Sequence, residues 1–174
     1  WPLSGEPEIS SSKGYLASKG NLNNYQLQLD SHLNLTDLPP ADINLKGKGN
    51  LQSFDLSTLM VKTLQGDVQL NGNLNWLSNL AWKGDLSING INFNELSKDY
   101  PGQLSGHIQH SVSVPLADNK QPAWTFNLPV IDLNGSYLKR PLTIKGKSSG
   151  DANQGFSINN LAINNAENSM LVNG

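Results

Sequence analysis

Three histidines carry the most versatile chemistry in this sequence, as metal ligands or as acid–base groups. His107 and His110 are three residues apart in an alternating segment, so they should point to opposite faces of a strand and cannot easily share a metal ion. His110 has the parity of the apolar residues Ile108 and Val112, which favours a hydrogen-bonded histidine near a groove edge over a catalytic one. His32 has polar parity and is expected in solvent.

The motifs of common enzyme classes are absent. The chain has no Gly-x-Ser-x-Gly, no glycine-rich phosphate loop and no His-Glu-x-x-His segment. The acidic residues are dispersed, so a catalytic carboxylate pair would have to come from distant strands. There is no cysteine, which excludes disulfides and thiolate metal sites. We therefore expect no enzymatic activity, no catalytic residue, no metal and no cofactor.

The composition of the chain limits the classes of partner that it is expected to bind. Charged residues make up 15% of the 174 residues and the net charge is −2. The Lys and Arg residues are scattered, with Lys139-Arg140 as the only adjacent pair, so nucleic acid is not an expected partner. Apolar runs are far shorter than the roughly 20 residues of a membrane-spanning helix. The chain begins at Trp1 rather than Met, and we expect it to be a fragment of a longer protein.

Apolar and polar residues alternate along most of the chain with the period of two that a strand imposes. One apolar and one polar face is typical of antiparallel sheets, so we predict a single all-β domain over residues 1–174 with roughly ten to twelve strands. Residues 54–64 are expected as strand, 94–99 as one helical turn and 147–155 as a loop. The apolar positions that we expect on one concave face are Leu27, Leu29, Leu33, Leu35, Ile43, Leu45, Val68, Leu70, Leu74, Trp76, Trp82, Leu86, Ile88, Ile108, Val112, Val114, Trp124, Phe126 and Leu128.

A short repeat ends several of these segments. Asp42-Ile-Asn-Leu-Lys-Gly47 recurs in similar form at residues 67–72, 85–90, 130–135 and 141–146. The final glycines carry the parity of the apolar residues. They would let a large sheet coil, or leave room for a ligand, and the two interpretations are compatible. These glycines are Gly47, Gly72, Gly90, Gly135 and Gly146.

These segments, in their order, resemble the TamB family. The resemblance rests on Trp1-Pro-Leu-x-Gly5, Gly20-Asn-Leu-x-x-Tyr-x-Leu-x-Leu29 with Gly49-x-Leu51, Asp67-Val-Gln-Leu-Asn-Gly-Asn-Leu-Asn-Trp76, and Leu80-Ala-Trp82-x-Gly-x-Leu-x-Ile-x-Gly90. It covers essentially the whole chain. It implies a taco-like sheet, folded along its length around an apolar groove, as in AsmA-like and bridge-like lipid transfer proteins. The family has no signature catalytic motif.

The resemblance also implies a location and partners. It places the chain in the periplasm, as part of a protein anchored in the Gram-negative inner membrane by a segment outside this sequence. Phospholipid acyl chains would occupy the groove, and the outer-membrane partner TamA would bind elsewhere in the protein. The tryptophans at 76, 82 and 124 would then either pack as core residues or contact acyl chains.

The sequence and the family resemblance leave three functional hypotheses to be weighed. The first is a conduit for phospholipid between the two membranes. The second is an assembly factor for outer-membrane proteins and autotransporters, whose sheet edges would pair with client strands. The third is a β-helical enzyme or adhesin, which the long strands and irregular repeat spacing disfavour. The sequence leaves open whether the apolar face closes on itself or takes a guest.

Overall fold

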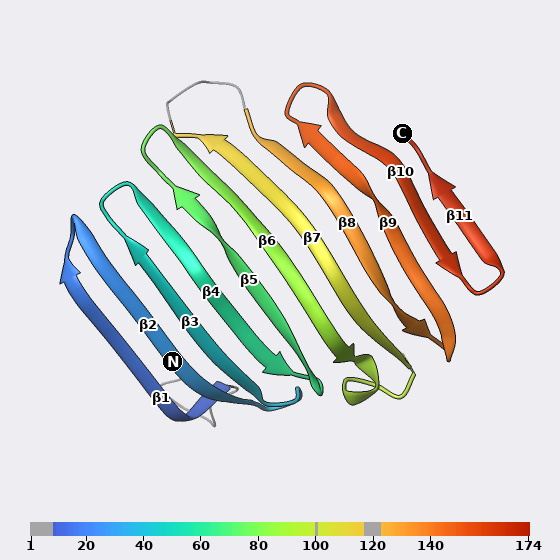
Figure 1. Ribbon diagram of the computed structural model, residues 1–174, viewed down its shortest axis with the longest axis horizontal. Helices are drawn as coiled ribbons and strands as arrows, with labels where there is room; N and C mark the ends of the chain where they lie inside the picture. The colour runs from blue at the N-terminus through green and yellow to red at the C-terminus, as the bar shows by residue number, and fades with distance from the viewer. Residues whose placement is uncertain (1–8, 100, 117–122) are drawn as a thin grey trace.

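A computed structural model describes residues 9–99, 101–116 and 123–174, which form one sheet of eleven strands (Figure 1). The strands are β1 (Ile9–Asn21), β2 (Asn24–Leu35), β3 (Ala41–Gly49), β4 (Ser53–Thr63), β5 (Gly66–Asn75), β6 (Asn79–Asn92), β7 (Gly102–Pro115), β8 (Thr125–Tyr137), β9 (Arg140–Asp151), β10 (Gly155–Asn165) and β11 (Asn168–Val172). A 3₁₀ turn, η1 (Phe93–Glu95), lies between β6 and β7.

Strand order in the sheet is the same as strand order in the chain. Each strand pairs antiparallel with the one before it and the one after it, so β1 and β11 are the two edges. The predicted all-β, antiparallel fold is confirmed, and the strand number falls within the predicted range.

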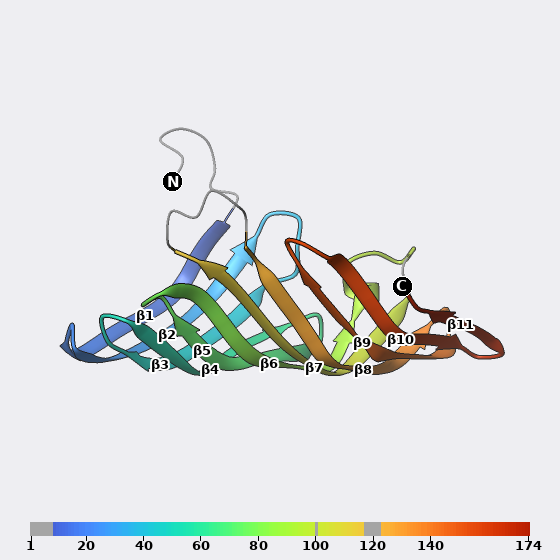
Figure 2. The ribbon, with the colours of Figure 1, turned by 90° about the horizontal axis from the view of Figure 1, so that it is seen from above.

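The sheet is curled rather than flat. In Figure 2 the middles of the strands lie at the base of the view and strand ends rise to the same side. This curled shape agrees with the taco-like sheet that the family resemblance implied.

β-Bulges interrupt the pairing inside several strands. At each one, two residues of a strand lie opposite a single residue of its neighbour, which bends the strand and shifts its alternation by one. In β4 the extra residue is Ser57, which interrupts the register with both β3 and β5. Bulges also lie at residues 89–90 of β6 and 160–161 of β10, and around Pro129 of β8, at residues 128–129 against β7 and 129–130 against β9.

Some sequence predictions of local structure were wrong. Residues 147–151, predicted as a loop, extend β9, because their backbone pairs with both β8 and β10 and needs no apolar side chains to do so. The helical turn expected at 94–99 is the shorter η1, which starts where the Asn92 side chain accepts a hydrogen bond from the Asn94 backbone N–H at 3.1 Å. The edge strands β1 and β11 were not predicted. The sequence Asp118-Asn119-Lys120-Gln121-Pro122 predicts a turn, and these residues lie outside the described ranges.

The sheet is a single layer. Its strands contact their neighbours in the sheet, and among the described residues only a few apolar side chains are buried, namely Ala41, Leu56, Ile91 and Leu133. Most apolar side chains are therefore partly covered by adjacent strands and partly open to solvent.

Candidate functional site

The pairing register sorts the side chains onto two faces, because directly opposed residues point to the same side of a sheet. Between β5 and β6 the pairs include Leu70 with Leu86 and Leu74 with Trp82. We call the side that holds Leu70 the apolar face. Following the pairs from strand to strand places these predicted residues on it: Leu27, Leu29, Leu33, Leu35, Ile43, Leu45, Val68, Leu70, Leu74, Trp82, Leu86, Ile88, Ile108, Val112, Val114, Phe126 and Leu128.

The other two predicted tryptophans lie just outside the strands. Trp76 follows β5, and its Nε1–H donates to the Leu51 carbonyl at 2.7 Å, which fastens the turn between β3 and β4. Trp124 precedes β8 and contacts Phe126 and Phe156, with ring centroids 6.1 and 5.6 Å away. These two rings therefore pack at the ends of strands.

The apolar face holds more residues than the predicted set. Most of the additional ones lie beyond bulges or on strands from which no predicted lining residue came, whereas Leu104 continues the regular alternation of β7. The signal that could have found them is the change in apolar parity, for example from Phe156 and Ile158 to Leu161 and Ile163 within β10. They include Phe54, Leu56, Leu59, Val61, Ile91, Leu104, Ile131, Leu133, Leu142, Ile144, Phe156, Ile158, Leu161 and Ile163.

Four of the repeat glycines lie on this face, and neighbouring atoms already occupy the space beside them. A side chain at Gly47 would bring a Cβ atom 2.3 Å from the Phe54 ring. At Gly72 it would come 2.4 Å from the Lys83 carbonyl oxygen and 2.7 Å from the Trp82 ring. Gly135 and Gly146 are equally crowded by backbone atoms. The missing side chains of these glycines thus leave room for aromatic rings and for the close approach of the neighbouring strand's backbone.

Gly90 differs from the other repeat glycines. It lies in the β6 bulge with a φ of +65°, and no atom beyond its two chain neighbours lies within 4 Å of where its Cβ would be. Its backbone N–H donates to Ser105 Oγ at 2.9 Å. The left-handed conformation, rather than crowding, accounts for glycine at this position.

His110 is hydrogen-bonded, as the sequence analysis favoured. Its Nε2 accepts from the Trp82 Nε1–H at 2.7 Å, and the two ring centroids are 6.0 Å apart. The Trp82 ring lies over Gly72 and Gly84, whose missing side chains let the indole lie close to the sheet. His110 pairs across the sheet with Gly84, which places it on the apolar face, and His107 is on the other face as predicted.

The opposite face carries polar side chains that pair with one another. His32 Nδ1 is 2.7 Å from an Asp42 oxygen, and His107 Nε2 is 3.1 Å from an Asp85 oxygen. Asp30 accepts hydrogen bonds from the side-chain amides of Gln28 and Asn44. These bonds lower the pKa of its carboxyl group, and the bond from Gln28 has the larger effect.

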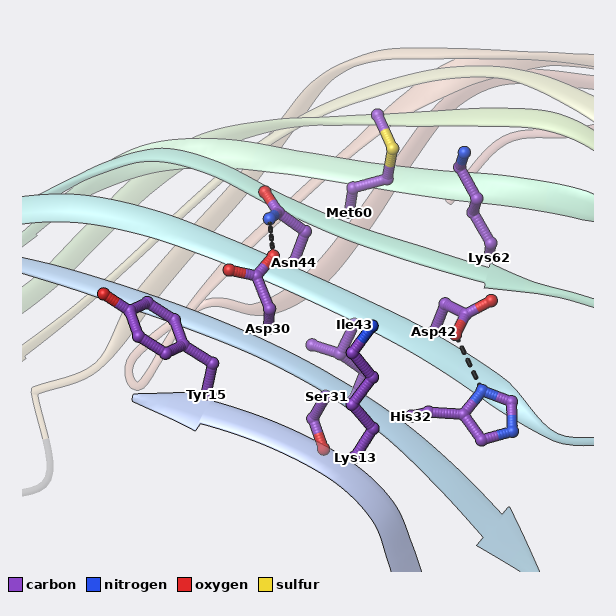
Figure 3. A pocket seen from close by; sticks show the side chains of 10 residues that line it. All are labelled: Lys13, Tyr15, Asp30, Ser31, His32, Asp42, Ile43, Asn44, Met60 and Lys62. Atoms are coloured by element: carbon purple, nitrogen blue, oxygen red, sulfur yellow. Dashed lines mark hydrogen bonds and ion pairs between the residues drawn. The ribbon is translucent and has the colours of Figure 1, made fainter. Parts of the chain in front are cut away.

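A shallow hollow of about 470 Å³ lies on this polar face, over β1 to β4 (Figure 3). Its lining mixes Lys13 and Lys62 with Asp30, Asp42 and His32, and Figure 3 shows the two acids bonded to Asn44 and His32. In the described ranges no three metal-ligating side chains come together. Because its acids are already partnered, this hollow is a weaker candidate site than the apolar face.

The apolar face is open to contact. Val112 and Val114 are each 41% exposed near one end of β7, and Phe156 is 75% exposed. Such a surface can bind an apolar molecule without first opening a core, since each methylene removed from water contributes about 0.8 kcal/mol. The candidate functional site is therefore this extended apolar face.

Comparison with known families identifies the chain. The model of the family described as "TamB, N-terminal domain" matches residues 1–174. The chain belongs to the TamB family. No solved structure matches it significantly.

A curated TamB relative is available for comparison. The chain is 26% identical over 156 residues to the protein named "Translocation and assembly module subunit TamB" from Haemophilus influenzae. The match covers 89% of this chain but 12% of that relative. This TamB-family chain thus corresponds to a small part of the length of that protein. None of its described helices is long and apolar enough to span a membrane.

Proposed function

We propose that this chain is a non-enzymatic section of a periplasmic conduit, whose apolar face is the concave side and binds the acyl chains of phospholipids moving between the inner and outer membranes. The observation that carries the proposal is the apolar face itself, which continues across the paired strands with no covering layer in the described part. The buried apolar side chains all lie on this side, as expected where a curled sheet crowds its inner face.

A continuous face favours movement along the sheet. Strands about 4.8 Å apart give eleven strands a length of roughly 48 Å, along which an acyl chain would meet similar apolar contacts at every step. The transfer free energy of the chain then stays nearly constant, so no single position traps it.

Family membership supports the wider setting. The curated relative is named as a subunit of the translocation and assembly module. We propose that this chain lies in the periplasm, that a segment outside it anchors the protein in the inner membrane, and that a further segment binds TamA in the outer membrane.

The open edges favour a second candidate function. The outer sides of β1 and β11 have no strand partner in the described part of the sheet. A client strand of an outer-membrane protein or autotransporter could pair there by β-augmentation. The two functions use different parts of the molecule, so variants can separate them.

Charges on the apolar face test the conduit. Ile108→Asp places a negative charge opposite Leu86 of β6. Leu70→Arg places a positive charge opposite Leu59 of β4. We expect both variants to fold, with a loss of about 1–2 kcal/mol in the free energy of unfolding because these side chains are only partly buried. In cells, we expect phospholipid to distribute abnormally between the two membranes. Gln109→Asp and Gln69→Arg add the same charges one residue away, on the polar face, and should leave the distribution normal.

Two outcomes would contradict the conduit. Ile108→Asp could fold stably and leave the lipid distribution unchanged. Alternatively, the polar-face controls could disturb the distribution as much as the apolar-face variants do. Normal lipids, together with a loss of outer-membrane protein assembly when β1 or β11 is altered, would favour the second function.

A further inference from the structure

His110 is an exception on the apolar face. Among the described paired positions of that face, the other ionisable residues are Tyr25, Tyr137 and Arg140, all at strand ends. His110 lies within β7, with Ile108 before it and Val112 after it on the same face. A polar group here costs free energy when an apolar ligand covers it, unless that ligand supplies a partner.

The bond to Trp82 fixes which nitrogen of His110 carries the proton. The Trp82 indole has a donor N–H and no acceptor. His110 Nε2, at 2.7 Å, must therefore accept, and the hydrogen of the neutral imidazole lies on Nδ1. His110 thus presents a hydrogen-bond donor on the apolar face.

That donor is available to a ligand. No described residue accepts a hydrogen bond from His110 Nδ1, and no polar side-chain atom in the described ranges is buried without a partner. Nδ1 is therefore accessible from solvent. On the β8 side the Leu128–Pro129 bulge leaves His110 without a directly opposed residue.

We propose that the His110 Nδ1–H binds an acyl oxygen, from either a carboxylate or an ester, of a ligand whose alkyl chain lies along the apolar face. This inference rests on the proposed function and adds a recognition point to it. A pure hydrocarbon that covers His110 strips water from the N–H without replacing the bond, whereas an acyl oxygen replaces it. Trp82 is a positioning residue, because it acts by fixing the His110 tautomer.

Three amphiphiles with the same twelve-carbon chain test the proposal. Dodecanoate offers a carboxylate, lauroyl lysophosphatidylglycerol offers an ester, and dodecyltrimethylammonium offers no acceptor oxygen. Affinities for the purified chain are measured by calorimetry below the micelle concentrations. In His110→Phe, binding of the two acyl ligands should weaken about tenfold, and binding of the ammonium should stay unchanged. If His110→Phe weakens the binding of dodecanoate but not that of the lysophospholipid, the site is restricted to carboxylates.

His110→Gln is the matched control. Glutamine keeps an oxygen to accept from Trp82 and an N–H to donate to the ligand, so it should restore most of the affinity for the acyl ligands. His107→Gln makes the same change on the polar face and should have no effect. Thermal unfolding verifies that each variant is folded, and ¹⁵N NMR of the wild-type imidazole should show the proton on Nδ1.

The results separate this inference from the proposed function. If all three amphiphiles bind the wild-type chain and His110→Phe equally, the acyl-oxygen site is wrong and the apolar conduit stands. If none binds the wild-type chain, both are wrong. A wild-type imidazole protonated on Nε2 would overturn the site even if the amphiphiles bind.

Discussion

Glycine within a strand usually weakens a sheet, because it adds backbone entropy to the unfolded chain and packs no side chain. On the apolar face of this chain it has a packing role. The Trp82 ring lies where Gly72 and Gly84 lack side chains, and the Phe54 ring lies beside Gly47. Large rings can therefore lie close to the sheet.

Replacing Gly72 by alanine should lower the free energy of unfolding by about 1–3 kcal/mol, because its Cβ would overlap the Lys83 carbonyl and the Trp82 ring. Gly14 is the matched control on the same face. Its Cβ would lie 3.6 Å from Ser11 Oγ, an ordinary contact, so Gly14→Ala should be neutral or slightly stabilising. Urea unfolding of the two variants measures the difference, and equal stabilities would contradict the crowding at Gly72.

Sequence parity was enough to place His107 and His110 on opposite faces, because the direction of a side chain alternates within one strand. Parity could not predict the bond between His110 and Trp82. These residues are 28 positions apart, and their meeting depends on the register between β6 and β7. Parity also could not predict the crowding at Gly72, because its neighbours Trp82 and Lys83 are brought there by the register between β5 and β6.

At the scale of strands, the bulges keep the apolar face continuous. In β4, Leu56 and Leu59 lie on the same face although they are three residues apart, because Ser57 is the extra residue between them. In β8, Leu128 and Ile131 are related in the same way. A change in apolar parity within one strand therefore marks a bulge, provided that the strand has one apolar face.

Deleting Ser57 should be tolerated. It removes the extra residue and leaves Leu56, Thr58 and Leu59 in regular alternation, so we expect folding with a loss below about 1.5 kcal/mol. Deleting Gln69 from the regular ladder between β5 and β6 should cost several kcal/mol, because it moves part of β5 to the wrong face. Circular dichroism with urea unfolding compares the two deletions. If both are equally damaging, the bulge does not set the faces.

The strands missed from the sequence share a lack of apolar alternation. β1 is rich in Ser, Lys and Gly, and the 147–151 end of β9 has no large apolar residue. Backbone pairing with a neighbour forms such strands, and no side-chain pattern records that pairing. Alternation in the sequence marks the strands that have one apolar face, whereas a strand held by backbone pairing alone leaves no such mark.

At the scale of the whole molecule, the edges control association. Leu171 of β11 is 62% exposed and lies on an outermost strand with a free side. We expect the isolated chain to self-associate by edge pairing, and Leu171→Lys to shift it toward monomer, because charge on an edge strand opposes pairing. Sedimentation velocity over a range of concentrations measures the change.

Leu77 provides the control for that experiment. It is 63% exposed, but it lies in the turn between β5 and β6, away from both edges. Leu77→Lys adds the same charge and removes a similar apolar area, so it should leave the association unchanged. If both variants reduce association equally, general surface stickiness, rather than edge pairing, is the cause.

The agreement between chain order and sheet order has a kinetic consequence. Every strand pairs with its immediate predecessor through a short connection, so no pairing has to wait for a distant part of the sequence. Contacts between residues near in sequence require little loop closure and form early. As the chain emerges from the machinery that makes or exports it, each new strand finds a template already in place. The sheet can grow by accretion at its newest edge, and its length is then set by how many strands are added.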